Sequence, residues 1–271
     1  MELAKRIISA IVMIALVLSA LIIGSWALVG LVMLVSVLMM LDVSRAFSKG
    51  GYNVNVLMML ALTLLVFPAV WFMEAKGYVV LCAVAFCVLA TYVVFEKHHD
   101  FKNALASLFM LVYPLLPATL FVLLSVYDVK NNTTTGKVLL TSAAACACIS
   151  DAAAYFGGRF FGKRKLCPAI SPKKTIAGSV AAVIGGGACG VALNFIFTSV
   201  HIPFAEWLFM GFACGILSQI GDLFASLLKR FCGVKDYGNY IPGHGGAMDR
   251  MDSIIPCTIF VIALAIGTGV L

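Results

Sequence analysis

Long runs of apolar residues fill most of this chain and are separated by short polar segments. Most runs approach or exceed the roughly 20 residues that an α-helix needs to cross the hydrocarbon core of a bilayer. They lack the alternation of about ten-residue strands that a membrane β-barrel requires. The pattern predicts helices near residues 7–23, 25–43, 55–74, 78–95, 104–127, 137–158, 174–198, 203–229 and 251–271. We therefore expect an all-α, polytopic integral membrane protein with about nine transmembrane helices.

Glycines and prolines add detail to these helices. Only Gly24 and Ser25 separate the first two runs, so a single long helix is the alternative there. Pro114 and Pro117 predict a kink in the fifth helix, because proline removes a backbone donor and clashes with the preceding turn. Close packing of the seventh helix, against neighbouring helices or another subunit, is predicted by Gly178, Gly185, Gly186, Gly187 and Gly190.

The composition agrees with a membrane protein. The chain is 62% hydrophobic and 11% charged, whereas charged residues make up about 25% of an average soluble domain. Most of the nine cysteines lie in apolar segments and none forms a C-x-x-C pair. Cysteine in such surroundings behaves as a small buried hydrophobe, so a zinc or redox role is not expected.

The basic residues predict an orientation in the membrane. Of the 19 lysines and arginines, only Lys76, Lys130 and Lys137 fall on the far side of the predicted helices. Under the positive-inside rule, the N-terminus and loops 159–174 and 229–250 are cytoplasmic, and the C-terminus lies outside the cell (inner) membrane. The net charge of +7 is then mostly a matter of loop placement, and no nucleic-acid partner is expected.

The sequence suggests two functional parts. Residues 1–135 carry the first five helices, and residues 136–271 form a C-terminal region with loops 159–174 and 229–250. Loop 159–174 has six basic residues and no acid, a composition that attracts anionic membrane lipid. Its end, Ser171–Thr175, also lies where the positive end of the next helix favours a phosphate. Both interpretations hold if the substrate is itself an anionic lipid.

The stretch 221–253 carries the strongest chemical pattern. Ser226 and Lys229 follow Asp222 by four and seven residues, which places all three on one face of a helix. Glycines and a proline then interrupt the helix before Asp249. Carboxylates suit Mg²⁺, lysine and arginine suit phosphate, and glycines let backbone N–H groups approach an anion. The stretch predicts a nucleotide or pyrophosphate site.

Other polar residues leave alternatives open. Asp151, inside the sixth helix, is either functional or paired structurally with Arg159. His244 stands among glycines and prolines, where we expect it to contact phosphate rather than to transfer a proton. Helix capping explains one of Asp249 and Asp252, but not both with a basic residue between them.

These residues resemble a known signature. The pattern of the phosphatidate cytidylyltransferase family, also called CDP-diacylglycerol synthases, is similar to Ser226-x-Leu228-Lys229-Arg230, then Lys235-Asp236, then Pro242-x-His244-Gly245-Gly246-x-x-Asp249-Arg250-x-Asp252. A second resembling block runs from Asp151-x-x-Ala154-Tyr155-Phe156-x-Gly158-Arg159-x-x-Gly162-Lys163 to Ser171-Pro172-Lys173-Lys174-Thr175. The two blocks cover the C-terminal half, and the first five helices match mainly in hydropathy. The chain departs from the family with Ala177 in place of an acid and Ala153 in place of a glycine.

The resemblance implies a reaction and a set of site residues. CTP and phosphatidate would give CDP-diacylglycerol and pyrophosphate in phospholipid biosynthesis, with magnesium held by Asp222 and Asp249 and room for a second cation such as K⁺. The catalytic residues would be Asp222, Asp249, Lys229, Arg250 and His244. The substrate-binding residues would be Ser171, Lys173, Lys174, Thr175, Ser226, Arg230, Lys235, Asp236, Gly245, Gly246 and Asp252. A homodimer is also expected from the resemblance and the glycine-rich seventh helix.

Three other functions are weighed against this one. A CTP-dependent kinase of a polyprenol or diacylglycerol would use the same nucleotide but transfer its γ-phosphoryl group. An anion or lipid transporter would also need intramembrane charge and glycine-rich helices. A CDP-alcohol phosphotransferase is disfavoured, because its acidic motif begins with Asp-Gly and the chain contains no Asp-Gly pair.

Overall fold

The computed structural model describes residues 2–95, 101–240, 243 and 245–271, with side chains from residue 8 onward. The chain forms two compact units. The first unit comprises Met1–Thr133 and Phe231–Asp249, and the second comprises Thr134–Arg230 and Arg250–Leu271. The loop after the eighth predicted helix therefore clusters with the N-terminal helices, although it follows them by about a hundred residues.

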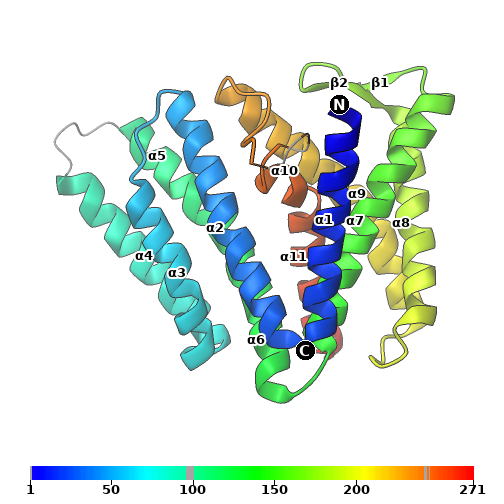
Figure 1. The fold of residues 1–271 in the computed structure, drawn as a ribbon, viewed down its shortest axis with the longest axis horizontal. Helices are drawn as coiled ribbons and strands as arrows, with labels where there is room; N and C mark the ends of the chain where they lie inside the picture. Colours follow the sequence, from blue (N-terminus) through cyan, green and yellow to red (C-terminus); the bar gives the residue numbers. More distant parts are fainter. Residues whose placement is uncertain (1, 96–100, 241–242, 244) are drawn as a thin grey trace. The chain divides into compact units, whose positions relative to one another are not determined.

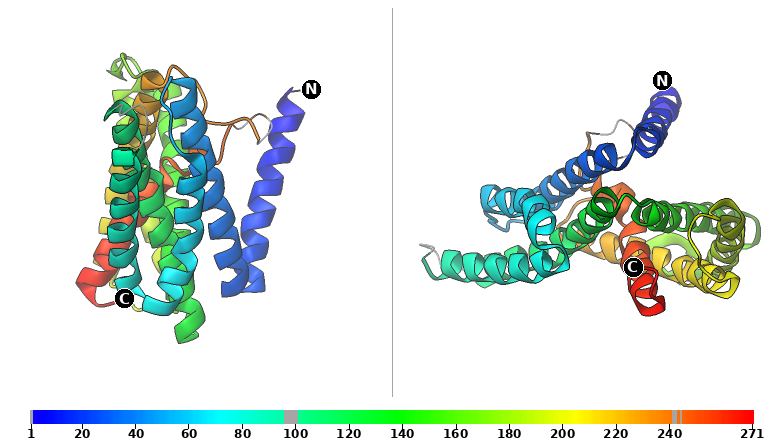
Figure 2. Two further views of the ribbon diagram at one scale, coloured as in Figure 1. Left: turned by 90° about the vertical axis from the view of Figure 1, so that its left-hand side faces the viewer. Right: turned by 90° about the horizontal axis from the view of Figure 1, so that it is seen from below.

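The first unit is a set of helices that run alongside one another (Figure 1, Figure 2). Helices α2, α3 and α6 pack against one another, α1 packs on α2, and α4 packs on α3. The elements are α1 (Glu2–Ile23), α2 (Ser25–Lys49), α3 (Val56–Met73), α4 (Ala75–Phe95), α5 (Phe101–Met110), the π-helical segment η1 (Leu111–Leu115) and α6 (Leu116–Asn131).

Two predicted irregularities are present in the first unit. Gly24 has a φ of 125°, a conformation that favours glycine, and it separates α1 from α2. The single long helix that we considered there is therefore wrong. The predicted kink in the fifth helix is confirmed at η1, where Pro114 follows Tyr113 with φ −145° and ψ 96°. Pro117 then lies in the first turn of α6, where its missing N–H costs little.

The described part of the second unit contains the long helices α7, α8 and α9, the shorter α11 and a small hairpin (Figure 1). Helix α8 packs closely on α7, and α11 also packs on α7. The strands pair antiparallel, with Lys165 opposite Thr175 and Cys167 opposite Ser171. The elements are α7 (Thr135–Phe161), β1 (Lys165–Cys167), β2 (Ser171–Thr175), α8 (Ile176–Ile196), α9 (Phe204–Phe231), the short α10 (Met248–Met251) that ends the loop from the first unit, and α11 (Ile254–Thr268).

The hairpin was not predicted, because its basic strands lack the alternation of apolar and polar residues that marks a half-buried strand. It connects α7 to α8 and carries the lysines of loop 159–174. The predicted close packing of α8 is confirmed. A Cβ atom on Gly186 would lie 2.4 Å from the carbonyl oxygen of Gly211, so α8 and α9 touch through their backbones.

The helices fit the predicted all-α membrane architecture. Among the residues that the structure describes, seven helices are long and apolar enough to cross a membrane, counting the kinked Phe101–Asn131 rod as one. Two shorter apolar helices, Ile8–Ile23 and Ile254–Thr268, correspond to the first and last predicted spans. The count of nine therefore stays a prediction, while the positions of the helices follow those that the sequence predicts.

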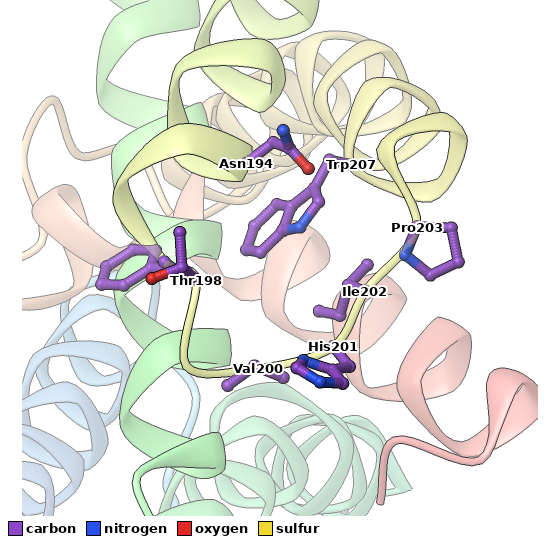
Figure 3. Close-up of a pocket in the computed structure, with 8 residues that line it drawn as sticks. Asn194, Thr198, Val200, His201, Ile202, Pro203 and Trp207 are labelled. Atoms are coloured by element: carbon purple, nitrogen blue, oxygen red, sulfur yellow. The ribbon is translucent and has the colours of Figure 1, made fainter.

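A cavity of about 420 Å³ opens at the loop between α8 and α9 (Figure 3). Trp207 forms part of its wall, and Asn194, Thr198 and His201 supply polar groups. This end of α8 is the opposite one from the hairpin. The cavity contains none of the predicted site residues, so it is not the candidate active site.

Candidate active site

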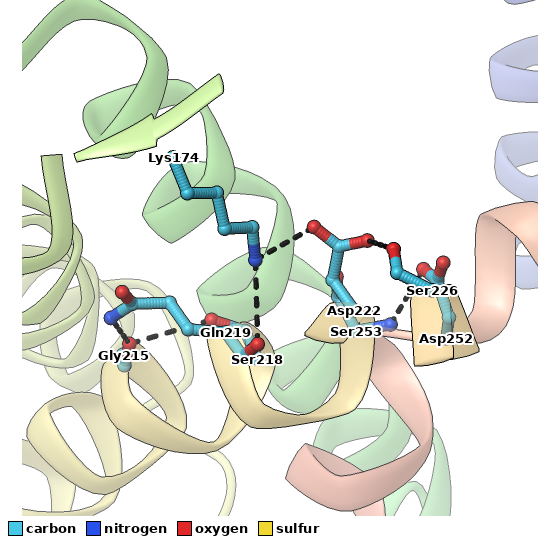
Figure 4. Close-up of polar contacts among 8 residues, drawn as sticks. All are labelled: Lys174, Gly215, Ser218, Gln219, Asp222, Ser226, Asp252 and Ser253. Atoms are coloured by element: carbon cyan, nitrogen blue, oxygen red, sulfur yellow. Dashed lines mark hydrogen bonds and ion pairs between the residues drawn. The ribbon is translucent and has the colours of Figure 1, made fainter. Parts of the chain in front are cut away.

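The second unit brings Lys174 onto Asp222. Lys174 stands at the end of β2, and Asp222 lies two turns before the end of α9. The Nζ atom of Lys174 is 2.7 Å from Oδ2 of Asp222, and the two side chains are 22% and 33% exposed. Ser226, one helical turn after Asp222, donates a hydrogen bond to its Oδ1 at 3.5 Å (Figure 4). The predicted common face of Asp222 and Ser226 is confirmed.

Lys174 is also held by the backbone of α9. Its Nζ donates to the carbonyl oxygen of Gln219 at 3.3 Å. The Gln219 side chain in turn donates to the carbonyl of Gly215 at 2.7 Å and to that of Ser179 at 3.3 Å. The ammonium of Lys174 thus neutralises Asp222 in this structure, and the predicted contact of Lys174 with phosphate stays a prediction. A carboxylate that attracts a cation in this way is chemically suited to a metal ion.

The turn before α11 lies against the same part of α9. A Cβ atom on Gly221 would be 2.2 Å from the backbone oxygen of Asp252, so only glycine permits this approach. Asp252 is 7% exposed, and its Oδ1 accepts a hydrogen bond from the Ser253 amide at 2.8 Å. Asp252 therefore folds back on the start of α11, beside the residue that precedes Asp222.

Asp151 belongs to the same group of charges. Its carboxylate interacts with the Ser253 hydroxyl and lies within electrostatic range of Asp222, Lys174 and Arg250. The alternative pairing with Arg159 is not what the described residues show, because Arg159 donates to the Tyr155 hydroxyl at 3.2 Å. In the second unit, Asp151 and Lys174 from one motif block therefore lie near Asp222 and Arg250, which are distant from them in sequence.

In the first unit, the segment between α9 and α10, called here the glycine loop (residues 232–247), supplies backbone groups to Asp249. The side chain is 8% exposed, and its Oδ2 accepts hydrogen bonds from the amides of Tyr237 and Gly246, each at 2.9 Å. Gly245 has a φ of +80°, and a Cβ atom there would be 2.8 Å from the same oxygen. Because one of its donors, the Tyr237 amide, precedes it by twelve residues, Asp249 is more than a helix cap. The Gly246 amide, which we predicted to approach an anion, donates to Asp249.

Sequence reasoning missed Asp42, a residue of α2 that contacts this loop. It is fully buried, and its Oδ2 accepts a hydrogen bond from the Met248 amide at 3.0 Å. The signal was available, since an acid inside an apolar helix is costly and is usually functional. The partner was not predictable, because Met248 is 206 residues away in sequence.

The remaining predicted residues fall into groups by exposure. Thr175 is buried and caps α8, since its Oγ1 accepts from the Gly178 amide at 3.2 Å. That N–H group of the helix end is therefore occupied by the protein itself. His244 lies outside the described residues. Ser171 and Lys229 are half-buried, and the exposed members are Lys173, Arg230, Lys235, Asp236 and Arg250.

The carboxylates of Asp222 and Asp249 are the predicted ligands of magnesium. Asp222 belongs to the second unit and Asp249 to the first, so the structure describes each carboxylate separately. No cluster of three or more acidic, histidine or cysteine ligands occurs in the part of the chain that the structure describes. Magnesium typically binds through one or two carboxylates and takes its other ligands from water and substrate phosphates. Two aspartates fit that requirement, and their joint role stays a prediction.

The fold and these residues define a polytopic helical membrane protein with a charged site suited to phosphate-bearing molecules. The chain belongs to the cytidylyltransferase family, whose model matches residues 4–266.

Relatives named phosphatidate cytidylyltransferase are similar to parts of the chain. The Bacillus subtilis (strain 168) protein is 43% identical over 128 residues, covering 44% of this chain and 46% of the relative. The Staphylococcus epidermidis (strain RP62A) protein is 32% identical over 185 residues, covering 67% and 65%. The Haemophilus influenzae protein is 36% identical over 169 residues, covering 59% and 57%. Each alignment spans less than two thirds of the relative.

Proposed function

We propose that the protein is a phosphatidate cytidylyltransferase, which joins CTP and phosphatidate to form CDP-diacylglycerol and pyrophosphate. The observation that carries the proposal is the contact between Lys174 and Asp222, because it brings a basic residue of one motif block to a carboxylate one helical turn before Ser226, where the other block begins. The family match over residues 4–266 and the names of the relatives support the same activity.

The proposed reaction is a displacement at phosphorus. A phosphate oxygen of phosphatidate forms a bond to the α-phosphorus of CTP, and the bond from that phosphorus to the oxygen of the leaving pyrophosphate breaks. The nucleophile is already ionised, so no strong general base is needed. Catalysis then rests on positioning the two phosphates and neutralising their charge.

The acidic residues are proposed to hold the metal. Asp222 and Asp249 would be the ligands of Mg²⁺, which when bound neutralises the phosphates and the departing pyrophosphate. A second cation such as K⁺ is part of the same proposal. Lys174, whose ammonium is 2.7 Å from Asp222, would lie beside this proposed metal ligand and would neutralise a substrate phosphate.

The basic and polar residues are proposed to bind the substrates. Asp252 would orient Arg250, while Ser226 and His244 would add hydrogen bonds to phosphate oxygens. Lysine and arginine neutralise phosphate with different geometry, arginine through a planar fork and lysine as a point charge. The proposed phosphate-binding cations are Lys173, Lys174, Lys229, Arg230, Lys235 and Arg250.

We also propose that the protein lies in the inner membrane as a homodimer, with its N-terminus and site loops in the cytoplasm. Phosphatidate would then enter from the inner leaflet and CTP from the cytoplasm. Single cysteines introduced at Gly243 and Asn131 should react with an impermeant reagent from opposite sides of the membrane. Equal labelling of the Gly243 position from outside would overturn this orientation, and the mass of the detergent-solubilised protein tests the dimer.

The activity is tested by following label from α-³²P-CTP into chloroform-soluble lipid. Transfer by the purified protein should require both phosphatidate and magnesium. Appearance of γ-label instead of α-label in the lipid would show a CTP-dependent lipid kinase. Absence of both from the lipid with folded protein would remove the enzyme proposal, and metal-independent flux in vesicles would then indicate transport.

A further inference from the structure

Asp42 connects helix α2 to the loop that carries Asp249. The side chain is fully buried, and α2 is otherwise almost entirely apolar up to that point. Its Oδ2 accepts the Met248 amide at 3.0 Å, and the Ala247 amide also interacts with the carboxylate. A buried carboxylate is costly unless hydrogen-bonding donors surround it. The loop supplies backbone donors to Oδ2, whereas Oδ1 has no hydrogen-bond partner among the described residues.

The loop fits Asp42 only because it contains glycine at two positions. A Cβ atom on Gly238 would be 2.2 Å from Oδ1 of Asp42, and one on Gly246 would be 2.2 Å from Oδ2. Both distances are far shorter than any van der Waals contact. The loop therefore closes on the carboxylate from two sides, at two points eight residues apart.

Arg45 and Tyr240 extend this connection. Arg45 lies on α2 three residues after Asp42, and its guanidinium carbon is 4.5 Å from the centre of the Tyr240 ring. Burial and the nearby Asp42 raise the pKa of Tyr240 to about 12. Its hydroxyl thus stays protonated near neutral pH beside the carboxylate.

The turn before Asp249 divides its amides between two carboxylates. The Gly246 amide donates to Asp249, and the Met248 amide donates to Asp42. Asp42 therefore fixes the residue immediately before Asp249 in the chain. We propose that Asp42 is a positioning residue, which anchors the glycine loop to α2 and thereby sets the place of the Asp249 carboxylate. Its consequence for catalysis rests on the proposed function.

Replacing Asp42 with alanine should release the loop. The Met248 amide loses its acceptor, so hydrogen exchange at residues 237–240 and 245–249 should become at least about tenfold faster, while exchange in α3 and α4 stays unchanged. The magnesium concentration for half-maximal transfer should rise about 10-fold to 100-fold, as for loss of a group that orients a metal ligand. Unchanged exchange in folded Asp42→Ala protein would overturn the proposal.

Gly238→Ala tests the same contact while retaining the carboxylate and every motif residue. Its Cβ atom should push the loop from Asp42 and reproduce both effects. Combined with Asp42→Ala it should add little, because the clash is gone once the carboxylate is removed. Fully additive effects, or wild-type exchange in Gly238→Ala, would contradict the anchoring role, so the test stands even if Asp42→Ala does not fold.

Asp128→Asn is the matched control. Asp128 is another buried acid of the first unit, 1% exposed, and its carboxylate accepts from the Thr133 hydroxyl at 2.9 Å. Its replacement should leave exchange in the glycine loop and the magnesium requirement unchanged. An equal change in this variant would assign the Asp42 effect to general instability. Faster loop exchange in Asp42→Ala, in a protein that transfers no cytidylyl group, would refute the proposed function alone.

Discussion

Asp222→Asn and Asp249→Asn are each expected to reduce cytidylyl transfer about 1,000-fold or more, because each removes a charge proposed to hold magnesium against the phosphates. Asparagine has nearly the shape of aspartate, so the fold should persist. In Asp222→Asn the ammonium of Lys174 loses the charge that it neutralises at 2.7 Å. The variant should therefore bind magnesium poorly while its glycine loop keeps its wild-type hydrogen exchange.

Asp249→Asn should differ from Asp222→Asn in one respect. The Oδ2 atom of Asp249 accepts two backbone amides, and an asparagine side chain that places its NH₂ group there would set donors against donors. The loop should then exchange faster than in the wild type, in addition to the loss of transfer. Loss of transfer together with faster loop exchange would show that Asp249 shapes the loop as well as serving the proposed metal site. Loss of transfer alone is expected for Asp222.

Transfer of α-³²P label is the measurement for both variants, made at saturating CTP and over a range of magnesium concentrations. Glu74→Gln is the control, since Glu74 is an exposed acid whose charge pairs with Lys130 at 3.1 Å. It should transfer label at the wild-type rate. Near-normal transfer in either aspartate variant would remove that residue from the proposed metal site.

Much of the architecture was predictable because the membrane imposes it. The apolar runs give the helix positions to within a few residues for most spans, since each helix must satisfy its own backbone in lipid. Pro114 and the glycines of α8 likewise act through local sterics, which the sequence displays directly. The joint face of Asp222 and Ser226 followed from helical spacing alone.

The parts that were not predicted depend on contacts between distant segments. The β1–β2 hairpin is short and basic, so no hydrophobic alternation marks it. The contact of Lys174 with α9 was not predicted, because 45 residues separate Lys174 from Gln219. Asp42 shows the same limit, since its role appears only when the loop after α9 closes on α2.

A further large effect is expected from Gly211→Ala. This substitution should destabilise the second unit by about 3 kcal/mol, the upper end of the usual range for overpacking a core. Its Cβ atom would lie 2.3 Å from the carbonyl oxygen of Gly186 and 3.0 Å from the Cα of Gly190. Both atoms belong to the backbone of α8, so no side chain can rotate away. The two helices must separate, which loses dispersion contacts along their whole interface.

Thermal unfolding in detergent, with α9 followed by hydrogen exchange, is the measurement for Gly211→Ala. Gly267→Ala is its control in α11, because a Cβ atom there meets nothing within 4 Å. Alanine favours a helix over glycine by up to about 1 kcal/mol, so the control should be unchanged or slightly more stable. Opposite signs in the two variants would isolate the α8–α9 contact. A Gly211→Ala protein as stable as the Gly267→Ala control would show that the backbones of α8 and α9 do not approach each other so closely.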